Sequence, residues 1–276
     1  MDRLFLTDLD HTFLNSNQEI SPFSREVWNR KSKDFFLSVA TARSLSKVEE
    51  FFRGLNLNAP LVLLDGAMVV DIDKSLIDIN LLNLELGREI IEVGKEFDIY
   101  PFIIELDSLK SLKEKFFIPK LNLLNSYQSY LVENNYKSDK RLEVLDKITP
   151  QKSILKIVYM GEKEPLEALT KELKEKFGSS LELKLAPEKY MNCYFLTILN
   201  PKADKSHGLK ILSNYLNIPL GDTTTFGDSL NDIGMFRLSG ESVAVKNALE
   251  EVKKEASVVL DYSNDEDGVA RYLLTQ

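Results

Sequence analysis

The chain has 276 residues and a formal net charge of −8, and 43% of its residues are hydrophobic and 28% charged. This length allows one large or two moderate domains, and the composition excludes a disordered or fibrous protein. The acidic balance, without a long basic run, argues against a surface that coats nucleic acid or an anionic membrane, so small molecules are the expected partners.

The cysteine content indicates a reducing compartment, and the apolar runs are too short for a membrane span. The single cysteine, Cys193, lies in an apolar run, so no internal disulfide can form and a buried structural thiol is expected. No stretch approaches the roughly 18 to 20 apolar residues of a membrane span. We therefore expect a cytoplasmic protein without a cleaved leader, and a monomer or a small homo-oligomer, between which the sequence does not distinguish.

The first third of the chain alternates short apolar runs with amphipathic segments in a βαβαβ order. Because the strand runs are apolar throughout, both faces of each strand are expected to be buried, which favours a parallel sheet with helices on each side. Residues 68–82 alternate instead and carry a polar turn, so a hairpin is predicted there. The predicted strands are residues 4–7, 35–41 and 60–66, and the helices between them are residues 24–33 and 46–55.

From about residue 83 the helices become longer and more charged, which indicates an inserted α+β domain that extends to residue 186. Residues 123–140 are rich in Asn, Tyr and Ser and are predicted to be a polar surface segment of this insert. The other predicted elements are helices at 85–97 and 164–178 and strands at 100–105, 154–161 and 181–187.

After the insert the α/β rhythm returns. Strands are predicted at 193–199, 223–229, 242–245 and 257–260, and helices at about 206–216 and from about 231, 248 and 268. The expected architecture is an α/β fold with a Rossmann-like parallel-sheet core, made of residues 1–82 and 187–276 and interrupted by the α+β domain of residues 83–186.

Polar side chains follow several of the predicted core strands. In open parallel sheets, functional residues gather beyond the carboxyl ends of the strands. Each of these residues alone has an ordinary interpretation as a turn, a helix cap or a surface charge, but their joint occurrence favours one common site. They are Asp8, Asp10, Thr41, Arg43, Asp65, Asp228, Asn231 and Asp232, with Lys205 at the start of the helix that follows residues 193–199.

This set of residues suits phosphoryl transfer. A phosphate monoester is a dianion, so a carboxylate nucleophile can approach it only if a cation neutralises the charge between them. Asp8, Asp10 and Asp228 offer hard oxygen ligands, for which Mg²⁺ is the natural ion. Lys205 would add positive charge, and the Thr41 hydroxyl would donate a hydrogen bond to the phosphate. A nucleophilic aspartate and an acid/base aspartate would divide the reaction into two easier steps.

The motifs resemble those of the haloacid dehalogenase (HAD) superfamily, and within it those of the Cof-type phosphatases with a type IIB cap. The resemblance covers residues 1–82 and 187–276, and it implies a HAD core with the insert as an α+β cap. The similar stretches are DLDHT (8–12), TAR (41–43), Lys205 in DKSHGL, GDSLNDIGMF (227–236) and SNDEDGVARYL (263–273).

The resemblance implies a Mg²⁺-dependent hydrolase of phosphoric monoesters that acts on a small phosphorylated metabolite, with a sugar phosphate favoured. Asp8 would be the nucleophile that forms an aspartyl-phosphate, and Asp10 the general acid and base. Asp8, Asp228 and the backbone carbonyl of Asp10 would ligate the metal. The implied phosphate-binding residues are Leu9, Thr41, Lys205 and Asn231, and the implied supporting residues are Thr12, Arg43 and Asp232.

Three departures from the family pattern concern the substrate rather than the chemistry. His11 stands where the family usually has Gly and is expected either to face the substrate or to pack against the cap. Ala42 also replaces a common Gly, which is a mild change. Asp65 replaces a common Asn and is expected to place a further carboxylate near the rim of the site. The physiological substrate and the cap residues that select it are not indicated, although residues 123–136 are a candidate lining.

Two other functions would use similar residues. A phosphomutase or phosphotransferase needs the same two aspartates and a second acceptor in place of water, so the sequence does not separate it easily from a phosphatase. A phospho-acceptor protein of the two-component receiver type also combines acids, a hydroxyl and a lysine on a parallel sheet. Turnover rather than storage, however, requires a second aspartate two residues after the first, as Asp10 is placed after Asp8.

Overall fold

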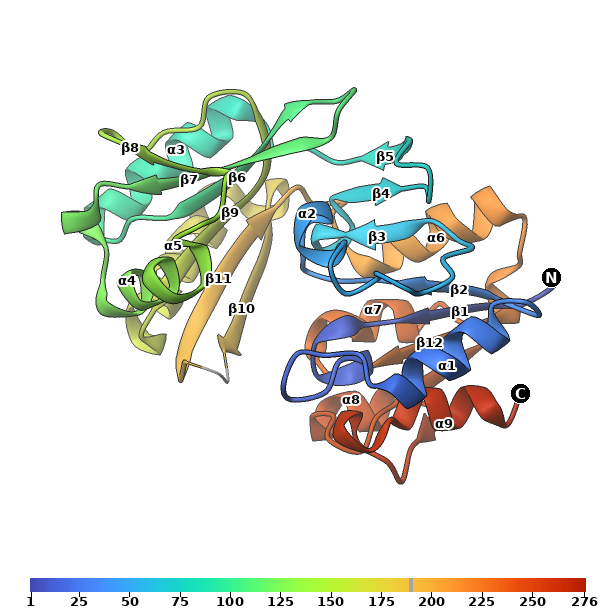
Figure 1. Ribbon diagram of the computed structural model, residues 1–276. Helices are drawn as coiled ribbons and strands as arrows, with labels where there is room; N and C mark the ends of the chain where they lie inside the picture. The colour runs from blue at the N-terminus through green and yellow to red at the C-terminus, as the bar shows by residue number, and fades with distance from the viewer. Residues whose placement is uncertain (189–190) are drawn as a thin grey trace. The chain divides into compact units, whose positions relative to one another are not determined.

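The computed structural model describes residues 1–188 and 191–276. The chain divides into two compact units, the first made of Met1–Ile79 and Ala203–Gln276 and the second of Asn80–Lys202. Figure 1 gives the course of the chain from one side. Among the described residues, none of the helices is both long and apolar enough to cross a membrane.

The first unit is built on a five-stranded parallel sheet with the order β14-β13-β12-β1-β2. The neighbouring strands β1 and β12 are buried along their whole length, which the apolar run of β1 predicted, whereas β12 is buried although it begins with three threonines. The strands are β1 (Leu4–Thr7), β2 (Phe36–Val39), β12 (Thr223–Gly227), β13 (Glu241–Ala244) and β14 (Val258–Val259).

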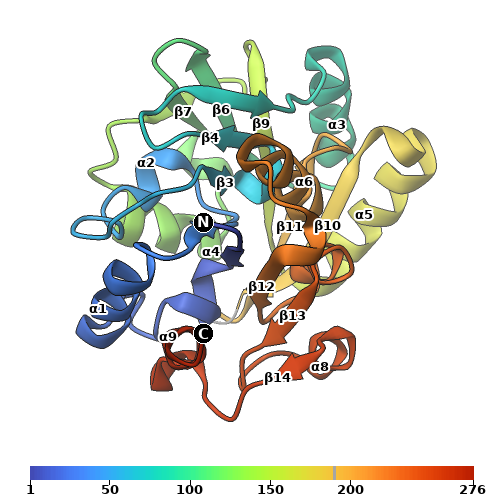
Figure 2. The same ribbon diagram turned by 90° about the vertical axis from the view of Figure 1, so that its right-hand side faces the viewer.

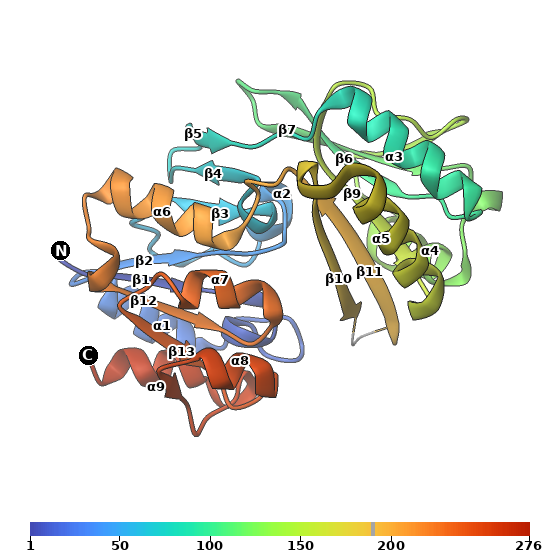
Figure 3. The same cartoon turned by 180° about the vertical axis from the view of Figure 1, so that it is seen from behind.

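Helices cover both faces of this sheet, so the α/β prediction is confirmed. Figure 2 shows α1 and α9 on one face, and α6 and α8 on the other, which Figure 3 displays from behind together with α7. The bounds are α1 (Pro22–Lys31), α6 (Lys205–Leu216), α7 (Ile233–Phe236), α8 (Glu250–Glu255) and α9 (Gly268–Leu274).

The helix predicted at residues 46–55 is shorter in the structure. Helix α2 covers only Leu45–Val48, and the following residues form tight turns in which Phe51 N–H donates to the Val48 carbonyl and Arg53 N–H to the Glu50 carbonyl. These bonds span three residues rather than four, and Gly54 then takes a φ of 83°, which ends any helical course.

A small antiparallel sheet continues the first unit after β2. The predicted hairpin is confirmed, since β4 (Met68–Val70) pairs with β5 (Leu76–Ile79) and with β3 (Leu61–Leu63). A parallel bridge between Ala40 and Val62 joins β3 to the end of β2.

The second unit is an α+β structure with a six-stranded sheet in the order β10-β11-β9-β6-β7-β8. Its neighbouring strands are antiparallel except for β7 and β8. The strands are β6 (Phe102–Ser108), β7 (Lys113–Pro119), β8 (Leu142–Leu145), β9 (Ser153–Gly161), β10 (Glu182–Glu188) and β11 (Cys193–Leu199).

Helices pack on both faces of this second sheet. One cluster joins α3 (Leu84–Glu96) and α5 (Lys163–Phe177) to the sheet, and the other joins α4 (Ser126–Leu131) and the following π-helical turn (Val132–Tyr136) to it. The first cluster contains Ile90, Tyr159, Leu169, Leu173 and Leu196, and the second contains Phe102, Phe116 and Ile118.

One prediction about the insert was wrong. Residues 193–199 were assigned to the core, but they form β11, which pairs antiparallel with β9 and β10 inside the second unit. The polar segment 123–140 lies at the surface, as predicted, and it contains α4, in which Gln128 is buried. The Gln128 side-chain amide donates to the Tyr100 carbonyl and accepts the Asn125 N–H, so this buried polar side chain has internal hydrogen-bond partners.

Candidate active site

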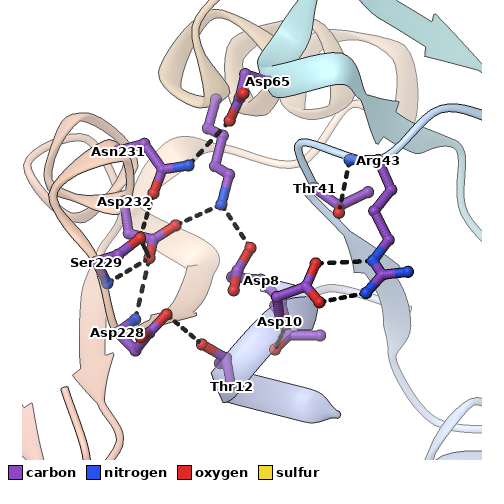
Figure 4. A network of polar contacts seen from close by, with 12 residues as sticks. Asp8, Asp10, Thr12, Thr41, Arg43, Asp65, Asp228, Ser229, Asn231 and Asp232 are labelled. Carbon is purple, nitrogen blue, oxygen red and sulfur yellow. Dashed lines mark hydrogen bonds and ion pairs between the residues drawn. The ribbon is translucent and has the colours of Figure 1, made fainter. Parts of the chain in front are cut away.

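The polar residues gather where β1, β2 and β12 end. These strands are parallel neighbours with β1 in the middle, so Asp8, Thr41 and Asp228, which follow them, come to the same edge of the sheet (Figure 4). Leu9 is fully buried in the loop after β1, and its carbonyl accepts the N–H of Leu14 at 2.8 Å. Every residue described below belongs to the first unit.

Lys205 is the fully buried cation of the site. It is the first residue of α6, whose N-cap Asp204 accepts the Ser206 N–H, and its Nζ donates to Asp8 Oδ1 at 2.6 Å and to Asp232 Oδ1 at 2.7 Å. Burial lowers the pKa of Lys205, but the carboxylates of Asp232, Asp8 and Asp65 outweigh it, so that the pKa lies above its ordinary value. The lysine is therefore positively charged at neutral pH.

Asp8 is a buried carboxyl group in an acidic environment. Burial raises its pKa, and although Lys205 lowers it, the neighbouring Asp232, Asp228 and Asp10 raise it again, so the net shift is well above the ordinary value. Full ionisation of Asp8 therefore calls for more positive charge than one lysine supplies.

The loop after β12 is organised around Asp232. Asp232 Oδ2 accepts the backbone N–H groups of Asp228 and Ser229, each at 3.0 Å. Gly227 is required at the end of β12, because a Cβ there would lie 2.4 Å from the Asp232 Cγ. On the other side, the Thr12 hydroxyl donates to Asp228 Oδ1 at 3.3 Å. Asp232 and Thr12 thus fix the position of Asp228.

Three carboxylates at this edge suit a hard divalent cation. Asp8, Asp228 and Asp232 are buried and offer oxygen atoms that all lie within 4.8 Å of one another. Full ionisation of the three beside Lys205 leaves two negative charges uncompensated in a dry site, which is unfavourable without a bound cation. Asp232 already accepts hydrogen bonds from two amides and Lys205, which leaves its carboxylate little capacity for a metal.

The Asp10 side chain turns away from these carboxylates and binds Arg43. Arg43 Nε donates to Asp10 Oδ2 at 2.8 Å and Nη2 donates to Oδ1 at 2.6 Å, which is a bidentate ion pair. The same Nη2 donates to Gln18 Oε1, and the Arg43 N–H donates to the Thr41 hydroxyl at 3.1 Å. Arg43 therefore connects the loops that follow β1 and β2.

His11 occupies a backbone position that favours glycine. Its φ is 59° and its ψ is 8°, which is the left-handed region, and its carbonyl accepts the Asn247 side-chain amide at 2.7 Å. This conformation gives a physical reason for glycine at the equivalent place in similar sequences. The histidine is half-buried.

Asp65 lies deeper than the sequence suggested. It was expected near the rim, but only 3% of its surface is exposed, and its Oδ1 accepts the Asn231 side-chain N–H at 2.9 Å. Asn231 in turn accepts a hydrogen bond from the Ser229 hydroxyl at 2.5 Å. The sequence analysis did not single out Ser229 or Asn247, because both residue types are common in turns. The only sequence signal for either of them was the position of Ser229 directly after Asp228.

Comparisons with known proteins identify the family to which the chain belongs. Residues 5–273 match the family model of haloacid dehalogenase-like hydrolases. The phosphatase YwpJ of Bacillus subtilis is 29% identical, with 98% of each chain covered. The 5-amino-6-(5-phospho-D-ribitylamino)uracil phosphatase YwtE of the same organism is 26% identical, with 96% of this chain and 95% of that protein covered.

Solved structures show the same fold. A haloacid dehalogenase-like hydrolase from Bacteroides thetaiotaomicron superposes with a TM-score of 0.80 at 23% identity, with 100% of this chain and 99% of that one covered. The HAD subclass IIB sugar phosphatase BT4131 gives a TM-score of 0.78 at 18% identity, with 99% and 98% covered. The chain therefore belongs to the haloacid dehalogenase-like hydrolases.

Proposed function

We propose that this protein is a phosphatase of the Cof-type subclass IIB, which hydrolyses a small phosphorylated metabolite through an aspartyl-phosphate on Asp8, with Mg²⁺ as its cofactor. The observation that carries the proposal is the position of Asp8 at the end of β1, 2.6 Å from the buried Lys205 ammonium and beside Asp228. A bound Mg²⁺ would supply the missing positive charge between the carboxylate and the phosphate dianion. Asp8, Asp228 and the Asp10 carbonyl are its proposed ligands.

In the first step, an Asp8 oxygen attacks phosphorus while the bond from phosphorus to the leaving oxygen breaks. Asp10 donates a proton to that oxygen, so the alcohol leaves uncharged. In the second step, Asp10 takes a proton from water, the water oxygen attacks phosphorus, and the bond to Asp8 breaks. Phosphate is released and both carboxyl groups return to their first state.

The phosphate would be held by donors that face the same edge of the sheet. Lys205 has three N–H donors, of which Asp8 and Asp232 use two, so the third is assigned to a phosphate oxygen. The Thr41 hydroxyl, the Leu9 amide and the Asn231 side-chain amide complete the proposed set. Because these donors are preorganised, they stabilise the negative charge of the transition state.

The bidentate ion pair with Arg43 fixes the position of the Asp10 side chain. The pairing keeps the Asp10 carboxylate at a fixed place between the two steps. When Asp10 holds a proton, one of its oxygens remains an acceptor for Arg43 and the other carries the proton. Arg43 is accordingly a supporting residue of the proposed mechanism.

For the substrate we propose a phosphorylated sugar or a sugar-derived chain. The support is that two similar proteins are named as a sugar phosphatase and as a phosphatase of a phospho-ribityl compound. In this proposal the core is the first unit and the insert, Asn80–Lys202, is the cap domain that selects the leaving group.

The test is a panel of phosphorylated sugars and polyols assayed for phosphate release with Mg²⁺, with and without added sugar acceptors. The proposal requires release of inorganic phosphate at a rate that acceptors leave unchanged. Transfer of the phosphoryl group to an acceptor in place of release would identify a phosphotransferase or mutase and overturn the assignment as a hydrolase.

A further inference from the structure

Asp65 and Ser229 hold the Asn231 side chain from two sides (Figure 4). Asp65 Oδ1 accepts the Asn231 Nδ2 hydrogen at 2.9 Å, and the Ser229 hydroxyl donates to Asn231 Oδ1 at 2.5 Å. An ionised carboxylate only accepts hydrogen bonds, so the amide can turn only its NH₂ group toward Asp65. The direction of the Asn231 amide is thereby determined by its neighbour.

The backbone that presents Asp65 is itself held firmly. Leu64, Asp65 and Gly66 take φ values of 53°, 56° and 93°, all in the left-handed region. The N–H of Leu64 donates to the Arg43 carbonyl at 3.0 Å and the N–H of Asp65 to the Thr41 carbonyl at 2.9 Å. A Cβ on Gly66 would lie 2.2 Å from the Asp204 carbonyl oxygen. The loop after β3 is therefore locked against the loop that carries Thr41.

We propose that Asp65 is a positioning residue of the phosphate site, which takes one N–H of Asn231 so that the second N–H is offered to a phosphate oxygen. This inference rests on the proposed function, in which Asn231 binds phosphate. An amide has two N–H donors on one nitrogen, and once one of them is bound the direction of the other follows from the planar geometry. Such preorganisation strengthens binding because the donor need not be ordered when the substrate arrives.

The Asp65 carboxylate has a second effect, because its negative charge also raises the pKa of Lys205. The two roles differ in what they require. Orientation of Asn231 needs an oxygen acceptor at position 65, whereas an effect on Lys205 needs a negative charge. Asp65→Asn keeps an acceptor and removes the charge, and Asp65→Gly removes both.

These two substitutions also suit the backbone. Asn and Gly both tolerate the left-handed conformation, so neither adds strain at the φ of 56°. Asp98→Gly is the matched control, since Asp98 is an exposed aspartate with a φ of 54° in the second unit. It reports what an Asp-to-Gly change at a left-handed position does to stability alone.

The experiment measures the inhibition constant of inorganic phosphate, together with kcat and KM for p-nitrophenyl phosphate, in the full-length protein with Mg²⁺. We expect Asp65→Gly to weaken phosphate binding about 10-fold or more, the scale of a lost hydrogen bond to a charged group. Asp65→Asn should remain within about 3-fold of wild type, because an amide oxygen can replace the carboxylate oxygen. Asn231→Ala in the Asp65→Gly background should add less than about 2-fold, because one interaction is removed twice.

Three results would overturn the inference. One is unchanged phosphate inhibition in Asp65→Gly. Another is an equal loss in Asp65→Asn and Asp65→Gly, which would assign the effect to charge. The last is that the losses of phosphate binding caused by Asp65→Gly and by Asn231→Ala add fully in the double variant. If Asp65→Gly does not fold, Asp65→Ala, which also lacks a side-chain acceptor, takes its place with the same expected loss. Absence of hydrolysis in wild type would instead contradict the proposed function, so the two failures are distinct.

Discussion

The ammonium group of Lys205 lies between two buried carboxylates, 2.6 Å from Asp8 and 2.7 Å from Asp232. Lys205→Met would remove the positive charge and leave both carboxyls without their partner. We expect a loss of about 3–5 kcal/mol in the free energy of unfolding, as for other buried pairs that lose one member. Phosphatase activity should fall about 100-fold or more, the scale for loss of one transition-state donor.

Urea denaturation and steady-state hydrolysis of p-nitrophenyl phosphate measure these two effects. Lys210→Met is the control, because Lys210 is exposed on the same helix. Full activity in Lys205→Met would remove this lysine from the proposed phosphate site.

Binding of Mg²⁺ should stabilise the folded protein through Asp8 and Asp228. A ligand that binds only the native state at about 100 times its dissociation constant adds about 2.7 kcal/mol to stability. We therefore expect Tm to rise with Mg²⁺ concentration and to return to its starting value with EDTA. Asp228→Asn should abolish the rise, whereas Asp222→Asn, at an exposed position just before β12, should keep it. A Tm that Mg²⁺ leaves unchanged in wild type would contradict the metal assignment.

The left-handed backbone of His11 predicts different outcomes for two substitutions. His11→Gly should keep the fold and the hydrolysis of p-nitrophenyl phosphate, because glycine adopts a φ of 59° without a steric penalty. His11→Val should destabilise the protein by about 1–2 kcal/mol, since a β-branched side chain is disfavoured there. Thermal unfolding and kcat measure both. A loss of activity in His11→Gly with Tm unchanged would show that the imidazole serves the reaction and not only the loop.

Glu105 should make the stability of the second unit depend on pH. Burial raises its pKa, although the N–H groups of Gln151 and Lys152, at 2.6 and 3.1 Å, oppose the shift. The native state therefore binds the proton more tightly than the unfolded chain does. This contribution to stability is complete below the unfolded pKa, about 4.5, and is lost as pH rises through the higher folded value.

Glu105→Gln should accordingly gain stability relative to wild type as pH rises from about 4.5 toward neutrality. Urea unfolding followed by far-UV circular dichroism at several pH values gives the comparison, with Glu89→Gln on the exposed side of α3 as the control. A stability difference between wild type and Glu105→Gln that is the same at all pH values would show that Glu105 does not titrate in this range.

The core sheet could be predicted from the sequence because its short strands alternate with amphipathic segments, and because β1 is an almost continuous apolar run. Residues 4–7 and 223–227 are buried on both faces, and polar residues follow directly after them. The parallel topology brings these ends together, so the position of Asp8, Thr41 and Asp228 at one edge of the sheet could be predicted.

The cap was less predictable, because its strands carry charges and have no single pattern. Strand β7, Lys113–Pro119, begins with alternating Lys and Glu and was missed. Strand β11 is apolar like a core strand, and only its antiparallel pairing with β9 assigns it to the second sheet. Such pairings depend on contacts far apart in the sequence, which local patterns do not encode.

Within the site, residue types and order were predictable, but the partners of the side chains were not. The sequence assigned Arg43 a supporting role but did not show its bidentate pair with Asp10. It also placed Asp65 near the rim, whereas three consecutive left-handed residues turn its carboxylate inward to Asn231. Backbone conformations of this kind depend on tertiary hydrogen bonds, here to the Thr41 and Arg43 carbonyls.

The central claim is that Asp8 carries the phosphoryl group, and the direct measurement is mass spectrometry of peptides from enzyme quenched with acid during turnover. In wild type, a phosphorylated peptide with the modification on Asp8 is expected. With a good leaving group, Asp10→Asn slows the attack of water more than the first step, so this variant should accumulate more of the phosphorylated peptide. Asp8→Asn should contain none and should be inactive. Hydrolysis that survives Asp8→Asn, or wild-type turnover with the phosphoryl group on another residue, would contradict this claim.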